Sequence, residues 1–132
     1  MKWLAYFGVT FIVFMGIDLI WLGFVAKNLY AKYLGYLMAP KINWVAALIF
    51  YVIFIIGILY FVIAPSLVDR NLGQLILRAA LFGFITYATY DLTNLATVRD
   101  WPITITIIDL IWGTTLSTSV SLISYLIITN FF

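Results

Sequence analysis

Four long runs of apolar residues dominate the chain, and each is long enough to cross a lipid bilayer. About 20 consecutive apolar residues cross the roughly 30 Å hydrocarbon core as an α-helix. Short stretches that hold most of the charged residues and all of the prolines separate these runs or lie at their ends. The pattern predicts four transmembrane helices, over residues 3–25, 43–64, 73–97 and 103–129.

The runs have the character of helices and not of barrel strands. None of them alternates strictly between apolar and polar residues, as the strands of a membrane barrel do. In lipid, only helices and closed barrels satisfy all backbone hydrogen bonds. We therefore expect an all-α integral membrane bundle, with residues 1–132 forming a single transmembrane domain. The links after the second and third helices are short, so neighbouring helices should be antiparallel.

The link between the first two helices, residues 26–42, is the longest. It carries aromatic residues and leucines with lysines between them. Such spacing suits a short helix lying flat in the membrane interface, although an ordinary aromatic loop explains it equally well. Indole rings prefer the headgroup zone, and three tryptophans stand at predicted helix ends: Trp3, Trp44 and Trp101.

Composition supports a membrane protein and excludes several kinds of chemistry. Of the 132 residues, 66% are hydrophobic and 9% are charged, and the mean hydropathy is +1.16. A soluble domain is closer to half apolar and a quarter charged. The net charge of +2 is too small to suggest a nucleic-acid partner. The chain has no Cys, His or Glu, which removes thiolate catalysis and the usual zinc ligands.

The basic residues barely decide the orientation of the bundle. Lys2, Arg70 and Arg78 fall on the side that holds both termini, whereas four basic residues fall on the opposite side: Lys27, Lys32, Lys41 and Arg99. Because basic residues favour the cytoplasmic side, this balance weakly favours termini that face out. It also permits two opposite insertions of the same chain, and hence a dual-topology homodimer.

Three aspartates fall within the predicted helices at similar depths. Near the first and third links, Asp18 lies nine residues before Lys27, Asp91 lies eight before Arg99, and Asp109 lies eight after Trp101. At 1.5 Å per residue this is roughly 12–13 Å below that surface, and Tyr51 falls at a matching depth on the second helix. An ionisable group in hydrocarbon is expensive unless it is paired, neutralised or hydrated, so each is a candidate functional residue. Each one could instead cap a neighbouring backbone or pair with a basic residue.

Polar residues recur on the inner stripes of the last two helices. Tyr87, Asp91 and Asn94 share one stripe, because they are spaced by four and three residues. A second stripe lies beside it: Thr86, Tyr90, Thr93 and Thr97. We expect this half of the helix to face a cavity or the bundle centre. A stripe of mostly small residues on the last helix should allow close packing: Thr106, Asp109, Gly113, Ser117, Ser121 and Ser124.

The string Ile-Asp-Leu-Ile-Trp occurs twice, at residues 17–21 and 108–112. It places Trp21 and Trp112 beside two of the aspartates. The two helices run in opposite directions, so a true repeat would be of the inverted kind, with its site near the midplane. The apolar positions of the string are common in this chain, and bulky packing explains the tryptophans at least as well as ligand binding.

Electrostatics restricts what a shared aspartate site could do. Three carboxylates close together in a medium of low dielectric cannot all be ionised, and they would titrate as a unit. We expect at least one to be protonated at neutral pH. A protonated aspartate can donate a proton, while an ionised neighbour can accept one or stabilise a cation. Asp18, Asp91 and Asp109 are the candidate catalytic residues, with Trp21, Tyr51, Tyr87, Asn94 and Trp112 lining a pocket.

The stretch from Tyr90-Asp91-Leu92-Thr93-Asn94 to Trp101-Pro102, together with Asp109-Leu110-Ile111-Trp112-Gly113, resembles a family of small bacterial membrane proteins. This family is catalogued as a domain of unknown function, number 2177, and Asp18 and Trp21 also fit its pattern. The resemblance covers the whole chain. It implies four transmembrane helices in a bacterial inner membrane, and it supplies no activity.

Three functions compete. The first is binding of a lipid or isoprenoid-like molecule, or acid/base chemistry on it, which needs no cofactor or metal. An aspartate-only Mg²⁺ or Ca²⁺ site ranks low, because it would be hard to load without loops open to water. The second is a small proton-coupled transporter, similar in layout to the small multidrug-resistance exporters. Those use a glutamate on their first helix, whereas this chain has Asp18 there.

The third function is an accessory subunit of a larger membrane complex. Its aspartates would then pair with basic residues of the partner. The small size of the chain favours this reading. Aspartates that face the bundle interior would disfavour it, and aspartates that face lipid would favour it.

Overall fold

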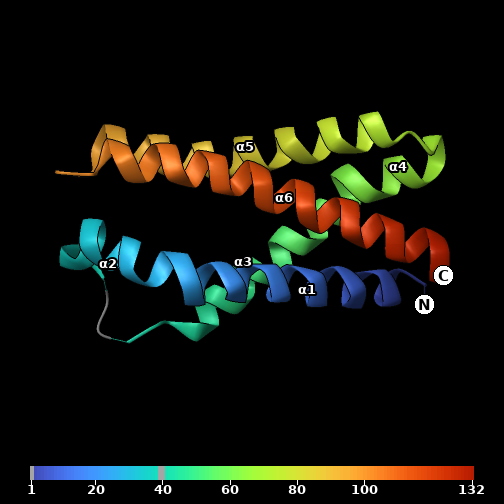
Figure 1. Ribbon diagram of the computed structural model, residues 1–132, viewed down its shortest axis with the longest axis horizontal. Coiled ribbons are helices and arrows are strands. Elements are labelled where there is room, and N and C mark those ends of the chain that lie inside the picture. Colours follow the sequence, from blue (N-terminus) through green and yellow to red (C-terminus); the bar gives the residue numbers. More distant parts are fainter. Residues whose placement is uncertain (1, 39–40) are drawn as a thin grey trace.

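The structure is a computed structural model that describes residues 2–38 and 41–132. These residues form helices and no strands, and the two termini lie at the same end of an elongated bundle (Figure 1). Four helical segments are long and apolar enough to cross a membrane: Lys2–Leu37, Trp44–Asp69, Leu72–Thr97 and Ile103–Phe131. The predicted all-α bundle of four membrane-crossing helices is therefore confirmed.

The first helical segment is longer than predicted. Helix α1 (Lys2–Trp21) continues through a π-helical stretch, η1 (Leu22–Ala26), into α2 (Lys27–Leu34) and ends in a 3₁₀ turn, η2 (Gly35–Leu37). Figure 1 shows α2 running on from α1 along the long axis of the bundle. Residues 27–37 are thus helical, which contradicts the loop interpretation, and they continue α1 instead of forming a separate helix across its end. The physical reason is that no proline interrupts the chain before Pro40.

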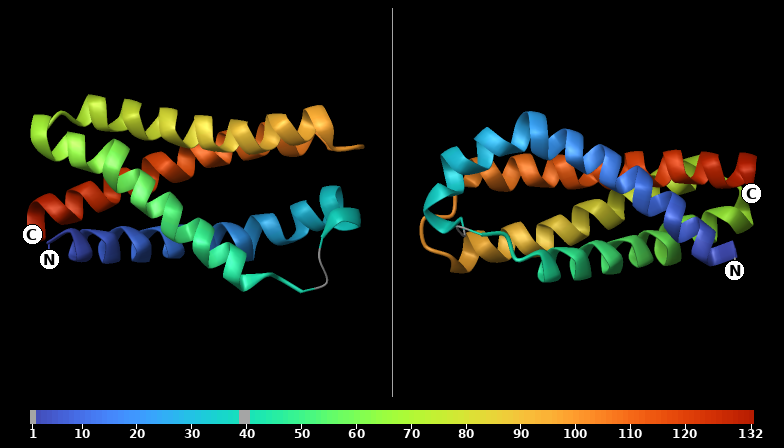
Figure 2. Two further views of the ribbon diagram at one scale, coloured as in Figure 1. Left: turned by 180° about the vertical axis from the view of Figure 1, so that it is seen from behind. Right: turned by 90° about the horizontal axis from the view of Figure 1, so that it is seen from below.

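The second helical segment also passes its predicted end. Helix α3 (Trp44–Ile58) runs through a second π-helical stretch, η3 (Leu59–Ile63), into α4 (Ala64–Asp69). Pro65 lies in the first turn of α4, where its missing N–H does little harm. The N–H of Ala64 donates to the carbonyl of Leu59, five residues earlier. This wider turn carries the helix past the proline, and Figure 2 shows the whole segment crossing the bundle obliquely.

The last two segments are regular helices with bounds close to those predicted. Helix α5 (Leu72–Thr97) is capped at its N-terminus by Asn71, whose side chain accepts a hydrogen bond of 3.1 Å from the N–H of Gln74. Helix α6 (Ile103–Phe131) follows Pro102. In the turn before α6, Trp101 is buried and donates a hydrogen bond of 3.1 Å to Thr106. It therefore packs inside the molecule and is not the exposed interfacial anchor that its position suggested.

Helices α5 and α6 form a tight hairpin, because small residues meet at their interface. A methyl group on Gly83 would approach the carbonyl oxygen of Gly113 to 2.3 Å and the side chain of Ser117 to 2.6 Å. The small-residue stripe of α6 is buried along its length, as the spacing predicted. Close backbone approach of this kind drives helix association in membranes.

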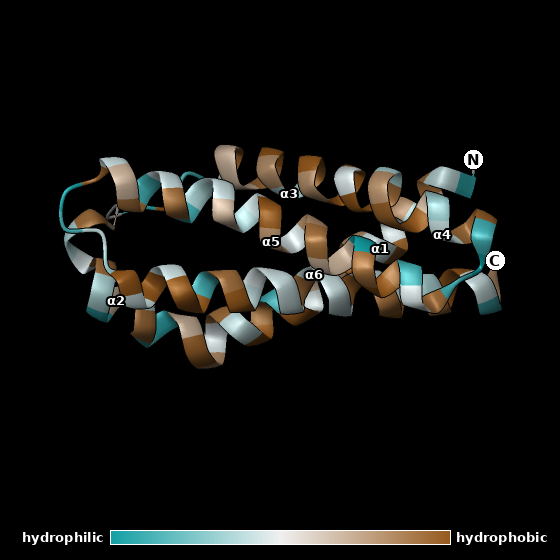
Figure 3. Cartoon of the chain, turned by 90° about the horizontal axis from the view of Figure 1, so that it is seen from above, coloured by the Kyte–Doolittle hydropathy of each residue, from teal (hydrophilic) through white to brown (hydrophobic). Residues whose placement is uncertain are grey.

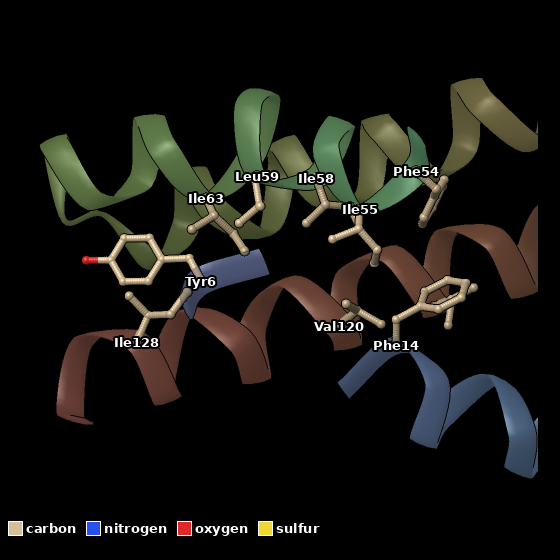
Figure 4. Packing of buried hydrophobic residues seen from close by; sticks show 10 residues of the cluster. Tyr6, Phe14, Phe54, Ile55, Ile58, Leu59, Ile63, Val120 and Ile128 are labelled. Atoms are coloured by element: carbon tan, nitrogen blue, oxygen red, sulfur yellow. The ribbon is translucent and has the colours of Figure 1, made fainter. Parts of the chain in front are cut away.

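The main apolar core joins α1, α3, η3 and α6 (Figure 4). Its buried members include Tyr6, Phe14, Phe54, Ile55, Ile58, Leu59, Ile63, Leu116, Val120 and Ile128. Many large apolar side chains remain exposed on the outer faces of the helices. Figure 3 shows hydrophobic residues along most of the helices, with hydrophilic ones at the two ends and at a few places within the helices. Such an apolar surface suits contact with lipid.

Candidate functional site

Asp91 of α5 and Asp109 of α6 lie side by side within the hairpin. The antiparallel packing that brings Gly83 to Gly113 also brings these two residues to the same level. Their carboxyl groups are close enough to interact electrostatically. Asp91 is fully buried, and Asp109 is 5% exposed. The two side chains that the sequence pattern placed on facing stripes are thus neighbours in the structure.

Asp91 has an unusual environment. Neither oxygen of its carboxyl group has a hydrogen-bond partner among the residues that the structure describes. Leaving a carboxylate buried and unpaired costs several kcal/mol, whereas a neutral carboxylic acid is far less costly. The ion pair found in the described part of the chain joins Arg78 to Asp69, at the far end of α5. Pairing of the three interior aspartates with Lys or Arg, which the sequence left open, is therefore not seen there.

Asp109 accepts a hydrogen bond from the hydroxyl group of Tyr30, which belongs to α2. Tyr30 lies within residues 26–42, which the sequence pattern predicts to be a link, so the pattern does not place it at the site. The missed signal is the absence of a helix breaker before Pro40, which lets the first helix carry Tyr30 back over α6. The contact connects the first helical segment to the α5–α6 hairpin.

Tyr87 of α5 lies at the centre of the polar residues. It is close enough to Asp18, Asp91 and Asp109 to interact with all three electrostatically, and also with Tyr51. Its ring lies against Gly113, where an added methyl group would come within 2.2 Å of Cγ. Tyr87 therefore lies within electrostatic reach of Asp18 and of the pair of aspartates on α5 and α6.

Asp18 is buried but stands apart from the other two aspartates. The rings of Trp21 and Trp112 stack with centroids 4.2 Å apart and planes 9° apart, which sets the register of antiparallel α1 and α6. Asp18 precedes Trp21 by three residues, so it is level with about Thr115. Asp109 lies six residues earlier on α6, or ~9 Å along the axis. The carboxyl groups are staggered by this register and do not form the single layer that counting suggested.

A cavity of about 320 Å³ opens beside the aspartate pair. It is lined by residues of α3, α5 and α6: Phe50, Thr86, Tyr87, Tyr90 and Asp109. Phe50 and Tyr90 are largely exposed, so they stand at the mouth, on the outer surface of the bundle. Part of the polar half of α5 thus lines a cavity, whereas Thr93 and Thr97 of the predicted stripe are exposed. Asp109 supplies the carboxyl group in the cavity wall.

The other predicted pocket residues occupy different places. Tyr51 packs against Phe14, with ring centroids 5.4 Å apart. Trp21 and Trp112 line a separate hollow of about 160 Å³. Asn94 lies three residues beyond Asp91 on the same helix and is partly buried. Of the predicted site residues, Tyr87 and Asp109 line the larger cavity.

The acidic side chains do not gather into a metal site in the described part of the chain. Among residues 2–38 and 41–132, no group of three or more Asp, Glu, His or Cys side chains could hold a metal ion. The titratable groups near the cavity are instead two neighbouring carboxyls and the phenols of Tyr30, Tyr87 and Tyr90. This arrangement suits proton transfer and hydrogen bonding to a bound molecule.

Comparison with curated proteins and with solved structures gave no match. A family model described as Predicted membrane protein (DUF2177) matches residues 3–126. The match covers nearly the whole chain, including all four helical segments and the residues around the cavity. The chain therefore belongs to the DUF2177 family of predicted membrane proteins.

Proposed function

We propose that this protein binds a hydrophobic molecule of lipid or isoprenoid type in the cavity beside Asp109 and performs acid/base chemistry on it. One observation carries the proposal: a cavity walled mainly by aromatic rings has a single carboxyl group in its wall, backed by a second, buried one. A pocket with a few convergent polar groups in apolar walls is the usual form of a small-molecule site.

The aspartate pair supplies the chemistry in this proposal. Two neighbouring carboxyl groups at low dielectric share protons as a unit. Asp91, buried and without a hydrogen-bond partner in the described part of the chain, is the protonated member. Asp109 accepts from Tyr30 and is the member that meets the ligand. A proton held by Asp91 can then pass through Asp109 to the bound molecule, or return from it.

The walls of the cavity indicate the kind of ligand. The rings of Phe50, Tyr87 and Tyr90 offer apolar surface, and their faces can stabilise a positive charge. The mouth lies between α3 and α5 on the apolar outer surface. A ligand would therefore enter sideways from the lipid, with its hydroxyl or cationic group toward Asp109.

The test is organic extraction and mass spectrometry of the molecules that co-purify with the protein. We expect an apolar compound enriched with the wild type and depleted with Asp109→Asn. The matched control is Asp100→Asn, the same chemical change in an exposed turn, where φ is 60° and asparagine is well tolerated. Equal recovery from the wild type and Asp109→Asn would overturn the proposal.

A second candidate function is proton-coupled transport. The observation that favours it is the stagger of Asp18 relative to the Asp91–Asp109 pair, with Tyr87 between them. Titratable groups at successive depths are typical of proton relays in membrane proteins. Asp18→Asn should then abolish proton-driven uptake in vesicles. Uptake with an unchanged pH dependence would contradict this role.

An accessory-subunit role has less support. All three aspartates are at most 8% exposed, so their charges are not presented to the basic residues of a partner. As a chain of four apolar helical segments, the protein could still associate with another membrane protein through its outer surface. Cross-linking in native membranes, with the aspartate variants as comparison, distinguishes this role because such contacts would survive Asp109→Asn.

A further inference from the structure

A second cavity lies at the end of the bundle that holds both termini, far from Asp109 (Figure 1). It has a volume of about 310 Å³ and lies between α1, α4 and the turn after α4. Lys2 and Arg70 contribute two cations to its wall, and Trp3, Tyr6 and Leu67 contribute aromatic and apolar surface. No acidic side chain lines it.

The cavity joins an apolar groove. The groove has a volume of about 370 Å³ and is lined by Trp3, Ile56, Leu59, Tyr60 and Ala64. Trp3 and Ala64 line both spaces, so the two are continuous there. Ile56 lies eight residues before Ala64 on the continuous α3–η3–α4 segment, so the groove extends ~12 Å from the end of the bundle toward its middle.

The two cations of the cavity are available for a ligand, whereas the third cation of this end is not. Arg78 forms an ion pair of 2.6 Å with Asp69 and donates to the hydroxyl of Ser66 at 3.0 Å. Arg70 adopts the left-handed conformation at the end of α4, with φ of 54°. Its Nε donates to the carbonyl of Leu67 at 3.1 Å, which leaves its terminal nitrogens for an anion.

We propose that this cavity and groove form a binding site for one anionic phospholipid. The phosphate lies between Lys2 and Arg70, and one acyl chain lies along the groove below Trp3. Charge complementarity favours an anionic headgroup, because basic pockets between membrane helices attract such lipids. The position of the site along the bundle also suits a lipid headgroup. Trp3 and the ends of the helices lie where the headgroup zone of the membrane is expected. A free phosphate would use the cations but not the groove.

The test is native mass spectrometry of the protein released from nanodiscs of phosphatidylcholine mixed with phosphatidylglycerol. We expect the wild type to retain phosphatidylglycerol in preference to phosphatidylcholine by about thirtyfold, an estimate based on two basic residues at the membrane surface. Equal retention of the two lipids would overturn the proposal without any variant. Inorganic phosphate in the buffer should not reduce the retained lipid, and its displacement of the lipid would indicate a phosphate site instead.

Two variants test the two parts of the site. Lys2→Gln combined with Arg70→Asn removes both cations, and asparagine tolerates the left-handed backbone at position 70. It should abolish the preference, whereas Lys27→Gln combined with Lys41→Gln, the same charge change at the other end of the bundle, should preserve it. An unchanged preference in the first double variant would contradict the assigned residues.

The acyl-chain groove is tested by Ile56→Trp. Ile56 is 52% exposed, so a larger side chain fills the groove without entering the core. Retention of phosphatidylglycerol should fall, although both cations remain. Undiminished retention would show that the groove is not part of the site. The Asp109→Asn variant serves as a further control, because this lipid site does not depend on the cavity beside Asp109.

Discussion

The indole ring of Trp21 stacks on that of Trp112, with centroids 4.2 Å apart and planes 9° apart. Each ring ends one copy of the string Ile-Asp-Leu-Ile-Trp, so the two copies meet at their last residues. The helices that carry them are antiparallel, so the two strings run in opposite directions away from the stack. The stack also sets how far Asp18 lies from Asp109 along the bundle.

The Trp21–Trp112 stack should contribute to stability through direct coupling. We expect a double-mutant cycle with Trp21→Ala and Trp112→Ala to give a coupling energy of about 1 kcal/mol, as for other aromatic pairs. The measurement is reversible unfolding in detergent, followed by near-ultraviolet circular dichroism. Strict additivity of the two single changes would show that the rings pack independently.

Gly113→Ala should disturb the site through packing. The added methyl group would come within 2.2 Å of Tyr87 Cγ, so the helices must separate or the ring must move. Overpacking of this kind costs about 1–3 kcal/mol. Gly16→Ala is the matched control, because nothing lies within 4 Å of its added methyl group. Thermal melts that show equal stability for the two variants would contradict the close approach of α5 and α6 at Gly113.

Asp91→Asn should abolish function while the protein still inserts and folds. The amide has nearly the same shape as the neutral carboxylic acid that we assign to Asp91, but it cannot release a proton. Size-exclusion profiles and melting temperatures should therefore stay near those of the wild type, while the activity or ligand recovery is lost. If Asp91→Asn and Asp109→Asn both prevent folding, the two aspartates have a structural role instead.

Tyr30→Phe should weaken the link between α2 and the hairpin. It removes the hydrogen bond to Asp109 and keeps the ring, at a cost of about 1.5–3 kcal/mol if Asp109 is ionised. Tyr33→Phe is the control on the same helix, because Tyr33 makes no side-chain hydrogen bond to any residue that the structure describes. Unfolding in detergent gives both values, and equal values for the two variants would argue against the Tyr30–Asp109 contact.

The near balance of basic residues predicts how the chain inserts. If it works as a dual-topology homodimer, tags at either terminus should be labelled from both sides of the membrane. A charge change at one end, such as Lys27→Gln with Lys32→Gln, should shift the population toward one orientation. One-sided labelling of the wild type would exclude the antiparallel dimer.

The sequence by itself determined the class of fold. Four apolar runs are long enough to cross a membrane, and in lipid a helix satisfies all of its backbone hydrogen bonds within one segment. It also identified the small-residue face of α6 and the polar face of α5, since both follow from the helical period. These features depend on local spacing, which one helix expresses without reference to another.

Only the tertiary structure decided which polar residues meet. The continuation of α1 through a π-helical stretch brings Tyr30 to Asp109, and the register of α1 against α6 moves Asp18 away from the aspartate pair. Counting residues from the helix ends could not predict the Tyr30–Asp109 contact or the displacement of Asp18. Both depend on how far each helix extends and on the axial register between neighbouring helices. That register is set by the fit of particular side chains, such as Gly113 against Tyr87 and Trp21 against Trp112.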